Sequence, residues 1–198
     1  MTSKIEGIFF DVGGVLGAPA VSSIYQQLIT THPSLSRERF RALLMDKRVL
    51  TGSIGTLDSL LATEYDDLTL ATEEILSGFR NLAVYRENIA IAKALRVRGY
   101  CVGIISDQIA ETAQMLRQTL NLENVFDPLL FSPELHLTKS TRDIFDNARH
   151  LTGYEASQLL MIDDHQFVLD IANEAGWKGL LYRYPSDLRE QLRPYGVL

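Results

Sequence analysis

The sequence predicts a doubly wound α/β fold, in which a parallel-sheet core carries helices on both faces and an inserted helical cap. Two observations indicate the core. The expected strands are short, continuous apolar runs, which are typical of strands buried on both faces. Helix-period segments lie between these runs, as strand–helix–strand units require. A third observation indicates the cap, because the alternation stops between about Ala18 and Tyr85.

The core elements follow from these apolar patterns. The expected strands are Gly7–Phe10, Tyr100–Ile105, Leu159–Ile162 and Gly179–Tyr182, with a weaker one over Pro128–Phe131. Apolar stripes at helical spacing predict helices over 89–95, 110–120, 144–151 and 167–175, and Gly176 is the expected C-terminal stop of the last. The core is therefore assigned to residues 1–17 and 86–198.

The segment between the two parts of the core is expected to be helical throughout. The predicted helices are Val21–Thr31, Arg37–Leu50, Leu57–Tyr65 and Ala71–Asn81, with breaks at Pro33 and at Gly52 to Gly55. Because the segment directly follows the first strand, we assign residues 18–85 to a helical cap domain and call them the helical segment.

Composition and charge exclude several classes of protein. The 198 residues are 46% apolar and carry a net charge of −6 without a dense Lys/Arg cluster, so a nucleic-acid partner is not expected. The single cysteine, Cys101, allows no intramolecular disulfide and no Cys/His metal site, which favours a reduced, cytoplasmic location. The first apolar run, Ile8 to Phe10, is too short for a signal peptide, and no run is long enough for a membrane helix.

Polar residues follow several of the expected strands at the point where each strand ends. Ligands of open α/β sheets bind outside these carboxyl ends. Asp11 follows three large apolar residues, and Gly13 and Gly14 leave the backbone beside it accessible to an anion. By itself, Asp11 is also compatible with the capping of a turn.

The second strand is followed by Ser106 and Asp107, and Lys139 precedes a segment that resembles a capping box, Ser140 to Asp143. A serine hydroxyl and a lysine at a helix N-terminus can both bind a phosphate oxygen. The competing interpretation is structural. Ser106 or Asp107 would cap the next helix, and Lys139 would be an ordinary solvated lysine.

Two adjacent carboxylates, Asp163 and Asp164, follow the apolar run 159–162. Such a pair is unfavourable unless a cation or hydrogen-bond donors lie nearby, and hard oxygen ligands of this kind suit Mg²⁺. A polar loop that caps a helix is the alternative.

Together these residues resemble the four motifs of the haloacid dehalogenase-like (HAD) hydrolase superfamily. The motifs are Phe-Phe-Asp11-Val-Gly-Gly-Val-Leu, Ile-Ile-Ser106-Asp, Lys139 and Met-Ile-Asp163-Asp164. The resemblance covers nearly the whole chain and implies a HAD-like Rossmannoid core. The helical insert and Phe131-Ser-Pro-Glu134 are similar to the subfamily with a small helical cap. The first motif is similar to the sugar-phosphatase branch with D-x-G-(N/G)-V.

The resemblance implies a mechanism. Asp11 would attack phosphorus and form an aspartyl-phosphate, which water then hydrolyses. Ser106 and Lys139 would hold the transferring phosphoryl oxygens. Mg²⁺ would be held by Asp11, the backbone carbonyl of Gly13 and Asp163, and Asp164 would orient the metal shell or Lys139. The implied substrate is a small phosphorylated metabolite such as a sugar phosphate.

Three departures from the family pattern stand out. Most phosphatases of the family carry an acid–base aspartate two residues after the nucleophile, where this chain has Gly13. A sugar 1-phosphate would need such an acid least, because an anomeric oxygen leaves more readily than an ordinary alcohol. His136 and Ser140 replace a frequent glycine and a usual proline around Lys139. His136 is a candidate substitute acid, since its intrinsic pKa suits neutral pH.

Two other functions remain open at this point. A 2-haloacid dehalogenase would share the fold and the lack of the second aspartate, but the metal-type pair Asp163-Asp164 argues against it. A degenerate family member would bind a ligand or partner without turnover.

Overall fold

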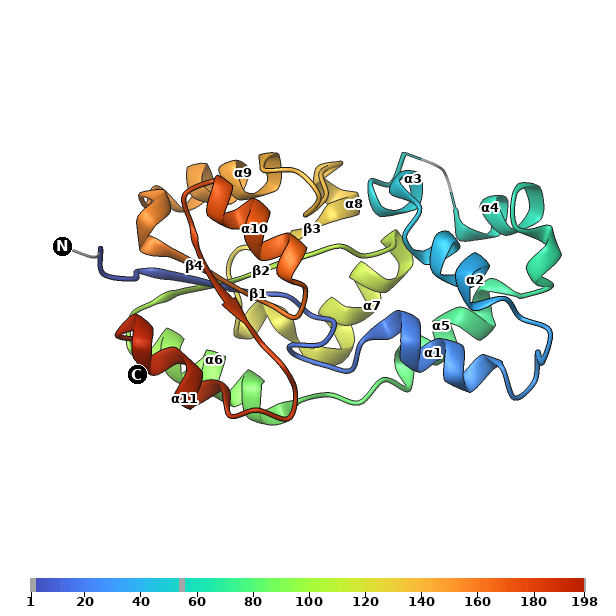
Figure 1. Cartoon of the computed structure of the whole chain (residues 1–198), viewed down its shortest axis with the longest axis horizontal. Coiled ribbons are helices and arrows are strands. Elements are labelled where there is room, and N and C mark those ends of the chain that lie inside the picture. Colours follow the sequence, from blue (N-terminus) through green and yellow to red (C-terminus); the bar gives the residue numbers. More distant parts are fainter. Residues whose placement is uncertain (1–2, 54–55, 198) are drawn as a thin grey trace.

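The computed structural model describes residues 3–53 and 56–197 and shows a parallel five-stranded sheet with flanking helices (Figure 1). The strand order is β3-β2-β1-β4-β5, with bounds β1 Gly7–Phe10, β2 Cys101–Ser106, β3 Leu129–Phe131, β4 Leu159–Asp163 and β5 Lys178–Leu181. Neighbouring strands pair in parallel throughout this order. The predicted α/β fold class is confirmed.

Two apolar clusters cover the two faces of the sheet. Strand residues alternate between them: Ile8 and Phe10 belong to one cluster, and Phe9 between them belongs to the other. On the first face pack helices α6 (Arg86–Val97), α7 (Ala110–Leu120) and α11 (Leu188–Leu192). On the second pack α9 (Asp143–Thr152) and α10 (Gln166–Glu174). Burial on both faces explains why the strands read as continuous apolar runs.

Short elements connect these layers. They are the 3₁₀ turns η2 (Leu122–Asn124), η3 (Ala156–Gln158) and η4 (Arg193–Tyr195), and the one-turn helix α8 (Ser132–Leu135). In the part of the chain that the structure describes, no helix has both the length and the apolar composition needed to cross a lipid bilayer.

The helical segment lies beyond the carboxyl ends of the strands in Figure 1. It contains α1 (Ala20–Leu28), α2 (Arg37–Leu44), α3 (Lys47–Leu50), α4 (Leu57–Thr63), η1 (Asp66–Leu68) and α5 (Thr72–Arg80). These helices bury an apolar cluster of their own, which includes Ile24, Phe40, Leu60 and Ile75. Ile109 from the core joins this cluster, so apolar packing connects the two parts. The exact domain boundaries stay a prediction.

One predicted helix is interrupted. The pattern over Arg37–Leu50 indicated a single helix, but α2 ends at Leu44 and α3 begins at Lys47. The cause is Asp46, whose Oδ1 accepts a hydrogen bond of 2.9 Å from the backbone N–H of Arg48. An aspartate that caps a new helix in this way competes with continuation of the preceding one. Gly55, expected to break the chain nearby, lies outside the described residues.

Candidate active site

The strand order brings three of the predicted residues to one edge of the sheet. Asp11 directly follows β1, Ser106 is the last residue of β2, and Asp163 is the last residue of β4. Strand β1 lies between β2 and β4, so the chain departs in opposite directions on its two sides. Such a switch point is where open α/β sheets bind ligands.

Asp11 is buried and held by two donors. Its Oδ1 accepts a hydrogen bond of 2.7 Å from the Ser106 hydroxyl and lies 2.9 Å from the Lys139 ammonium. Only 6% of Asp11 is exposed. Two donors on one oxygen fix the direction of the carboxylate, which a turn-capping aspartate would not need.

Lys139 connects the two buried carboxylates of the site, Asp11 and Asp163. Its ammonium lies 2.7 Å from Asp163 Oδ2 as well as near Asp11, and its backbone N–H donates to Asp107 Oδ1 at 3.0 Å. The side chain is almost fully buried, so it is not an ordinary solvated lysine. The interpretation of Ser106 and Asp107 as helix caps is also wrong, because the N-cap residue of α7 is Ile109.

The segment after Lys139 differs from its prediction. The capping box expected over Ser140 to Asp143 does not form, and α9 begins at Asp143 with Arg142 as its N-cap. The Ser140 hydroxyl instead lies 2.6 Å from the Thr138 hydroxyl. Lys139 therefore reaches the site from a connecting segment, and the field of a helix N-terminus does not explain its position.

Asp163 and Asp164 point to different neighbours. Asp163 Oδ1 accepts a hydrogen bond of 2.8 Å from the backbone N–H of His165, and Asp164 Oδ1 lies 2.6 Å from His165 Nδ1. The Asp164 carboxylate also lies against Gly14: a Cβ at that glycine would come within 2.3 Å of Asp164 Oδ2. Because Gly14 has no side chain, the turn after β1 and the Asp164 carboxylate can approach each other closely.

The charges of the site are unequal, because three buried or partly buried carboxylates surround one ammonium. Burial raises the pKa of Asp11 to about 7, against the opposing effect of the Lys139 charge. Burial also raises the pKa of Asp107. Burial works in the same direction on Asp163, but the charge of Lys139 and the hydrogen bonds from His165 outweigh it and lower the pKa. The pKa of Lys139 is raised because these carboxylates outweigh its own burial, so Lys139 stays protonated.

This excess of negative charge fits a divalent cation. The available donors are carboxylate oxygens of Asp11 and Asp163 and the backbone carbonyl of Gly13, which are hard ligands that Mg²⁺ prefers. Ligand atoms of Asp163, Asp164 and His165 also lie within 4.8 Å of one another. The chemistry of the residues present therefore suits a magnesium ion beside Lys139.

The side of Gly13 that would carry a side chain is open. A Cβ built there meets no atom within 4 Å. Gly13 also lines a cavity of about 60 Å³ with Gln108 from the core and Phe79 and Leu82 from the helical segment. Most of its wall is apolar. The place of the missing acid is thus an open space beside a largely apolar cavity.

Neither His136, the candidate substitute acid, nor His165, which follows the aspartate pair, contacts Asp11 among the described interactions. His136 Nδ1 lies 2.7 Å from the carbonyl oxygen of Thr51, so its N–H donates to the helical segment and joins it to the core. His165 has a side chain that is 67% exposed, and hydrogen bonds to Asp163 and Asp164 raise its pKa to about 10. His136 stays a candidate by sequence position only.

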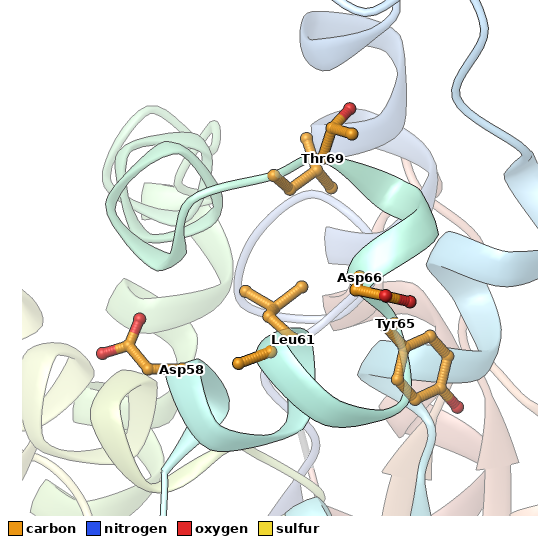
Figure 2. A pocket seen from close by; sticks show the side chains of 7 residues that line it. Asp58, Leu61, Tyr65, Asp66 and Thr69 are labelled. Atoms are coloured by element: carbon orange, nitrogen blue, oxygen red, sulfur yellow. The ribbon is translucent and has the colours of Figure 1, made fainter.

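A larger cavity lies within the helical segment and not at the sheet edge. Figure 2 shows this space of about 220 Å³, which is lined by Asp58, Leu61, Ala62, Tyr65, Asp66, Thr69 and Leu70. All of these residues come from α4, η1 and the chain between and directly after them. Two other large polar residues of the helical segment, Tyr25 and Arg48, do not line this cavity, and they bond to Leu35 and to Asp46 and Glu64.

Sequence analysis missed two buried polar residues beside the site. Gln108 Nε2 donates to the Ser106 hydroxyl at 2.9 Å, and the Thr112 hydroxyl donates to Gln108 Oε1 at 3.0 Å. Both are buried. The available signal was the position of Gln108 directly after Ser106-Asp107, but a polar residue after a strand is normally solvated.

The contact between Gly14 and Asp164 gives a prediction for stability. Gly14 has φ +76°, in the left-handed region, and a Cβ there would collide with the Asp164 carboxylate. We expect Gly14→Ala to lower the free energy of unfolding by about 1–3 kcal/mol, measured by denaturant or thermal unfolding. Gly13→Ala is the matched control and should be close to neutral, because its Cβ would enter open space. Equal effects of the two substitutions would contradict this view of the turn.

Comparison with known proteins agrees with the fold. The family model described as haloacid dehalogenase-like hydrolase matches residues 5–176. Curated proteins give no match. Among solved structures, a HAD family enzyme from Bacteroides thetaiotaomicron has a TM-score of 0.81 at 17% identity and covers 96% of this chain and 100% of its own.

Two further structures show the range of the likeness. A predicted HAD-like hydrolase from Porphyromonas gingivalis has a TM-score of 0.78 at 15% identity, over 97% of this chain and 98% of its own. The L-2-haloacid dehalogenase of Xanthobacter autotrophicus has a TM-score of 0.65 at 18% identity, over 96% of this chain and 81% of its own. At these identities the structures show the fold, and the family model shows the membership. The chain belongs to the haloacid dehalogenase-like hydrolases.

Proposed function

We propose that this hydrolase is a cytoplasmic, Mg²⁺-dependent phosphomonoesterase that acts on a small phosphorylated metabolite, with sugar phosphates as the first class to test. One observation carries the proposal. The buried Asp11 carboxylate lies within hydrogen-bond distance of both Ser106 and Lys139, at 2.7 and 2.9 Å. A nucleophile, a hydroxyl donor and a fixed cation therefore meet at one point.

In the proposed reaction, Asp11 attacks the phosphorus in line, and its oxygen forms the bond to phosphorus as the ester oxygen leaves. Water then hydrolyses the aspartyl-phosphate and regenerates the carboxylate. Ser106 and Lys139 donate to the equatorial phosphoryl oxygens, where charge is spread during the transfer. Asp107 holds the backbone N–H of Lys139 and so keeps the ammonium in place.

The proposed metal ligands are Asp11, the carbonyl of Gly13 and Asp163, with Asp164 orienting the shell. A bound Mg²⁺ supplies neutralisation of charge on the transferring group. The Bacteroides enzyme offers support: its aspartate-to-alanine mutant was crystallised in complex with magnesium and inorganic phosphate, and that structure has a TM-score of 0.77 at 16% identity to this chain. The excess of carboxylates over ammonium groups at this site supports the same cation.

The test is phosphate release from a panel of phosphate esters with Mg²⁺, compared with the same assay after chelation by EDTA. Release that requires Mg²⁺ supports the proposal. Metal-independent release of chloride from a 2-haloacid would instead favour a dehalogenase, a chemistry that the Xanthobacter enzyme of the same fold carries in its name. Calorimetric binding of ligands with no turnover would favour a non-catalytic member.

The open space at Gly13 gives a prediction for catalysis. We expect Gly13→Asp to raise kcat for an alkyl phosphate by about 10²-fold, since positioned acid–base groups contribute about 10²–10⁴-fold. The carboxyl group there, in its protonated form, would give its proton to the leaving oxygen and become a carboxylate, and nothing within 4 Å of the Cβ position obstructs it. p-Nitrophenyl phosphate should gain little, because nitrophenolate leaves without protonation.

Gly13→Asn is the matched control for this gain. It has nearly the shape of aspartate but carries no proton to transfer at neutral pH, so it should leave turnover of the alkyl phosphate near the wild-type value or lower it. An equal gain with asparagine, or no gain with aspartate in a folded protein, would show that proton transfer at this position does not limit the reaction.

A further inference from the structure

A buried chain of four polar side chains leads from helix α7 to Asp11. The Thr112 hydroxyl lies 3.0 Å from Gln108 Oε1, Gln108 Nε2 lies 2.9 Å from Ser106 Oγ, and Ser106 Oγ lies 2.7 Å from Asp11 Oδ1. None of the four is more than 8% exposed. Buried polar groups normally need partners, and here each partner leads one step closer to the carboxylate.

The donor and acceptor roles in this chain follow from the protonation state of its last member. The proposed nucleophile is ionised Asp11, and an ionised carboxylate only accepts, so in the reactive state the single hydroxyl proton of Ser106 points to Asp11. Ser106 Oγ can then only accept from Gln108, which places the amide nitrogen of Gln108 toward Ser106 and the amide oxygen toward Thr112. In its contact with this oxygen Thr112 can only donate, and the carbonyl oxygen of Ile109, also at 3.0 Å, is a second acceptor for the same hydroxyl. Gln108 supplies what a serine in its place could not: a donor for Ser106 and an acceptor for Thr112 at the same time.

The backbone of Gln108 is also held. Its N–H donates to Ser132 Oγ at 3.0 Å, and the Ser132 hydroxyl donates to the carbonyl of Gln108 at 3.3 Å. Ser132 is fully buried at the start of α8, after the edge strand β3. Hydrogen bonds thus hold the backbone of Gln108 at Ser132 and its amide oxygen at Thr112. Its amide N–H therefore faces Ser106 in one orientation.

We infer that Gln108 and Thr112 are positioning residues that lock the Ser106 hydroxyl as a donor toward the reaction centre. The inference rests on the proposed function, because it concerns the hydroxyl that would bind the transferring phosphoryl group. A hydroxyl rotates freely unless its acceptor side is occupied. Occupation by Gln108 leaves Ser106 with one proton, aimed at the site before substrate arrives, and donors fixed in this way stabilise developing charge without reorganisation.

The experiment compares Gln108→Leu and Thr112→Val in the wild-type and in the Ser106→Ala background. Both substitutions are neutral and similar in shape, so they remove hydrogen bonds without adding charge. We expect Gln108→Leu to lower kcat/KM for phosphate-ester hydrolysis by about 10- to 100-fold, the usual effect of losing a group that orients a reactive one. Thr112→Val should act in the same direction with a smaller factor.

The Ser106→Ala background separates positioning from a general structural role. If both residues act through the serine hydroxyl, their substitution there should change kcat/KM by less than about threefold. A structural role would lower activity by the same factor in both backgrounds. Thr152→Val is the matched control for Thr112→Val, because it removes a hydroxyl that bonds to Ala148 within α9, away from the site. It should leave kcat/KM unchanged.

The outcomes are distinguishable from failure of the proposed function. A wild-type protein with no Mg²⁺-dependent phosphate release overturns the proposed function and the positioning role together. An active wild type in which Gln108→Leu folds, by circular dichroism, and keeps full activity overturns only the positioning role. Equal losses in the two backgrounds overturn it as well. Loss in the wild-type background alone supports it.

Discussion

We expect Asp11→Asn to abolish phosphate release, with kcat lowered by roughly 10⁴-fold or more, the scale seen when a nucleophile is removed from an active site whose other groups remain. The amide keeps the size of the carboxylate, and its oxygen can still accept from Ser106. It cannot form the acyl-phosphate. The measurement is Mg²⁺-dependent release of phosphate from the best substrate of the panel.

Detection of the proposed aspartyl-phosphate intermediate would make the result specific to Asp11. Wild-type protein quenched in acid during turnover should gain the mass of one phosphoryl group on the peptide that contains Asp11, and the Asp11→Asn variant should not. Asp170→Asn on helix α10 is the matched control. Its carboxylate accepts a hydrogen bond from Gln166 on the same helix and has no contact with the site, so activity should be unchanged. Appreciable turnover by a folded Asp11→Asn protein would exclude Asp11 as the nucleophile.

The strand ends were the most predictable part of this protein. Continuous apolar runs that stop at Asp11, at Ser106 and at Asp163 are a consequence of burial on both faces of a parallel sheet, and the structure has β1, β2 and β4 in these places. Since parallel strands present their carboxyl ends at one edge, the meeting of these residues followed from the fold class. The structure adds that β2 and β4 include Ser106 and Asp163 as their last residues.

Residues that reach the site from connecting segments were harder to predict. The expected capping box after Lys139 and the family resemblance pointed to this lysine, but the capping box is absent. Its simultaneous contact with Asp11 and Asp163 depends on the path of a segment whose conformation local sequence does not determine. Gln108 shows the same limit, because its role depends on burial of a polar side chain. Asp46 shows a different limit of prediction, because its side chain caps a new helix and interrupts the helical pattern expected over Arg37–Leu50.

Replacement of Lys139 tests the charge balance of the site. With its side chain 7% exposed, the ammonium stands between Asp11 and the fully buried Asp163. We expect Lys139→Met to lower the free energy of unfolding by about 3–5 kcal/mol in EDTA, because removal of one partner leaves buried carboxylates without their counter-charge. The measurement is thermal or denaturant unfolding. Lys4→Met is the matched control, since that lysine pairs with Glu6 at the surface and should contribute almost nothing.

Adding Mg²⁺ should distinguish a role of Lys139 in balancing the charge of the site from a role in the reaction. If Mg²⁺ binds Asp11 and Asp163, it supplies part of the missing positive charge, so the rise in melting temperature on adding Mg²⁺ should be larger for Lys139→Met than for the wild type. Activity should not recover with stability. The metal cannot replace a donor to the phosphoryl oxygens, and loss of one such donor costs about 10²–10³-fold in kcat. A variant that Mg²⁺ fails to stabilise would argue that the metal does not bind these carboxylates, and one that Mg²⁺ returns to full activity would argue that Lys139 only balances charge. Stability regained without turnover would place the lysine in the reaction itself.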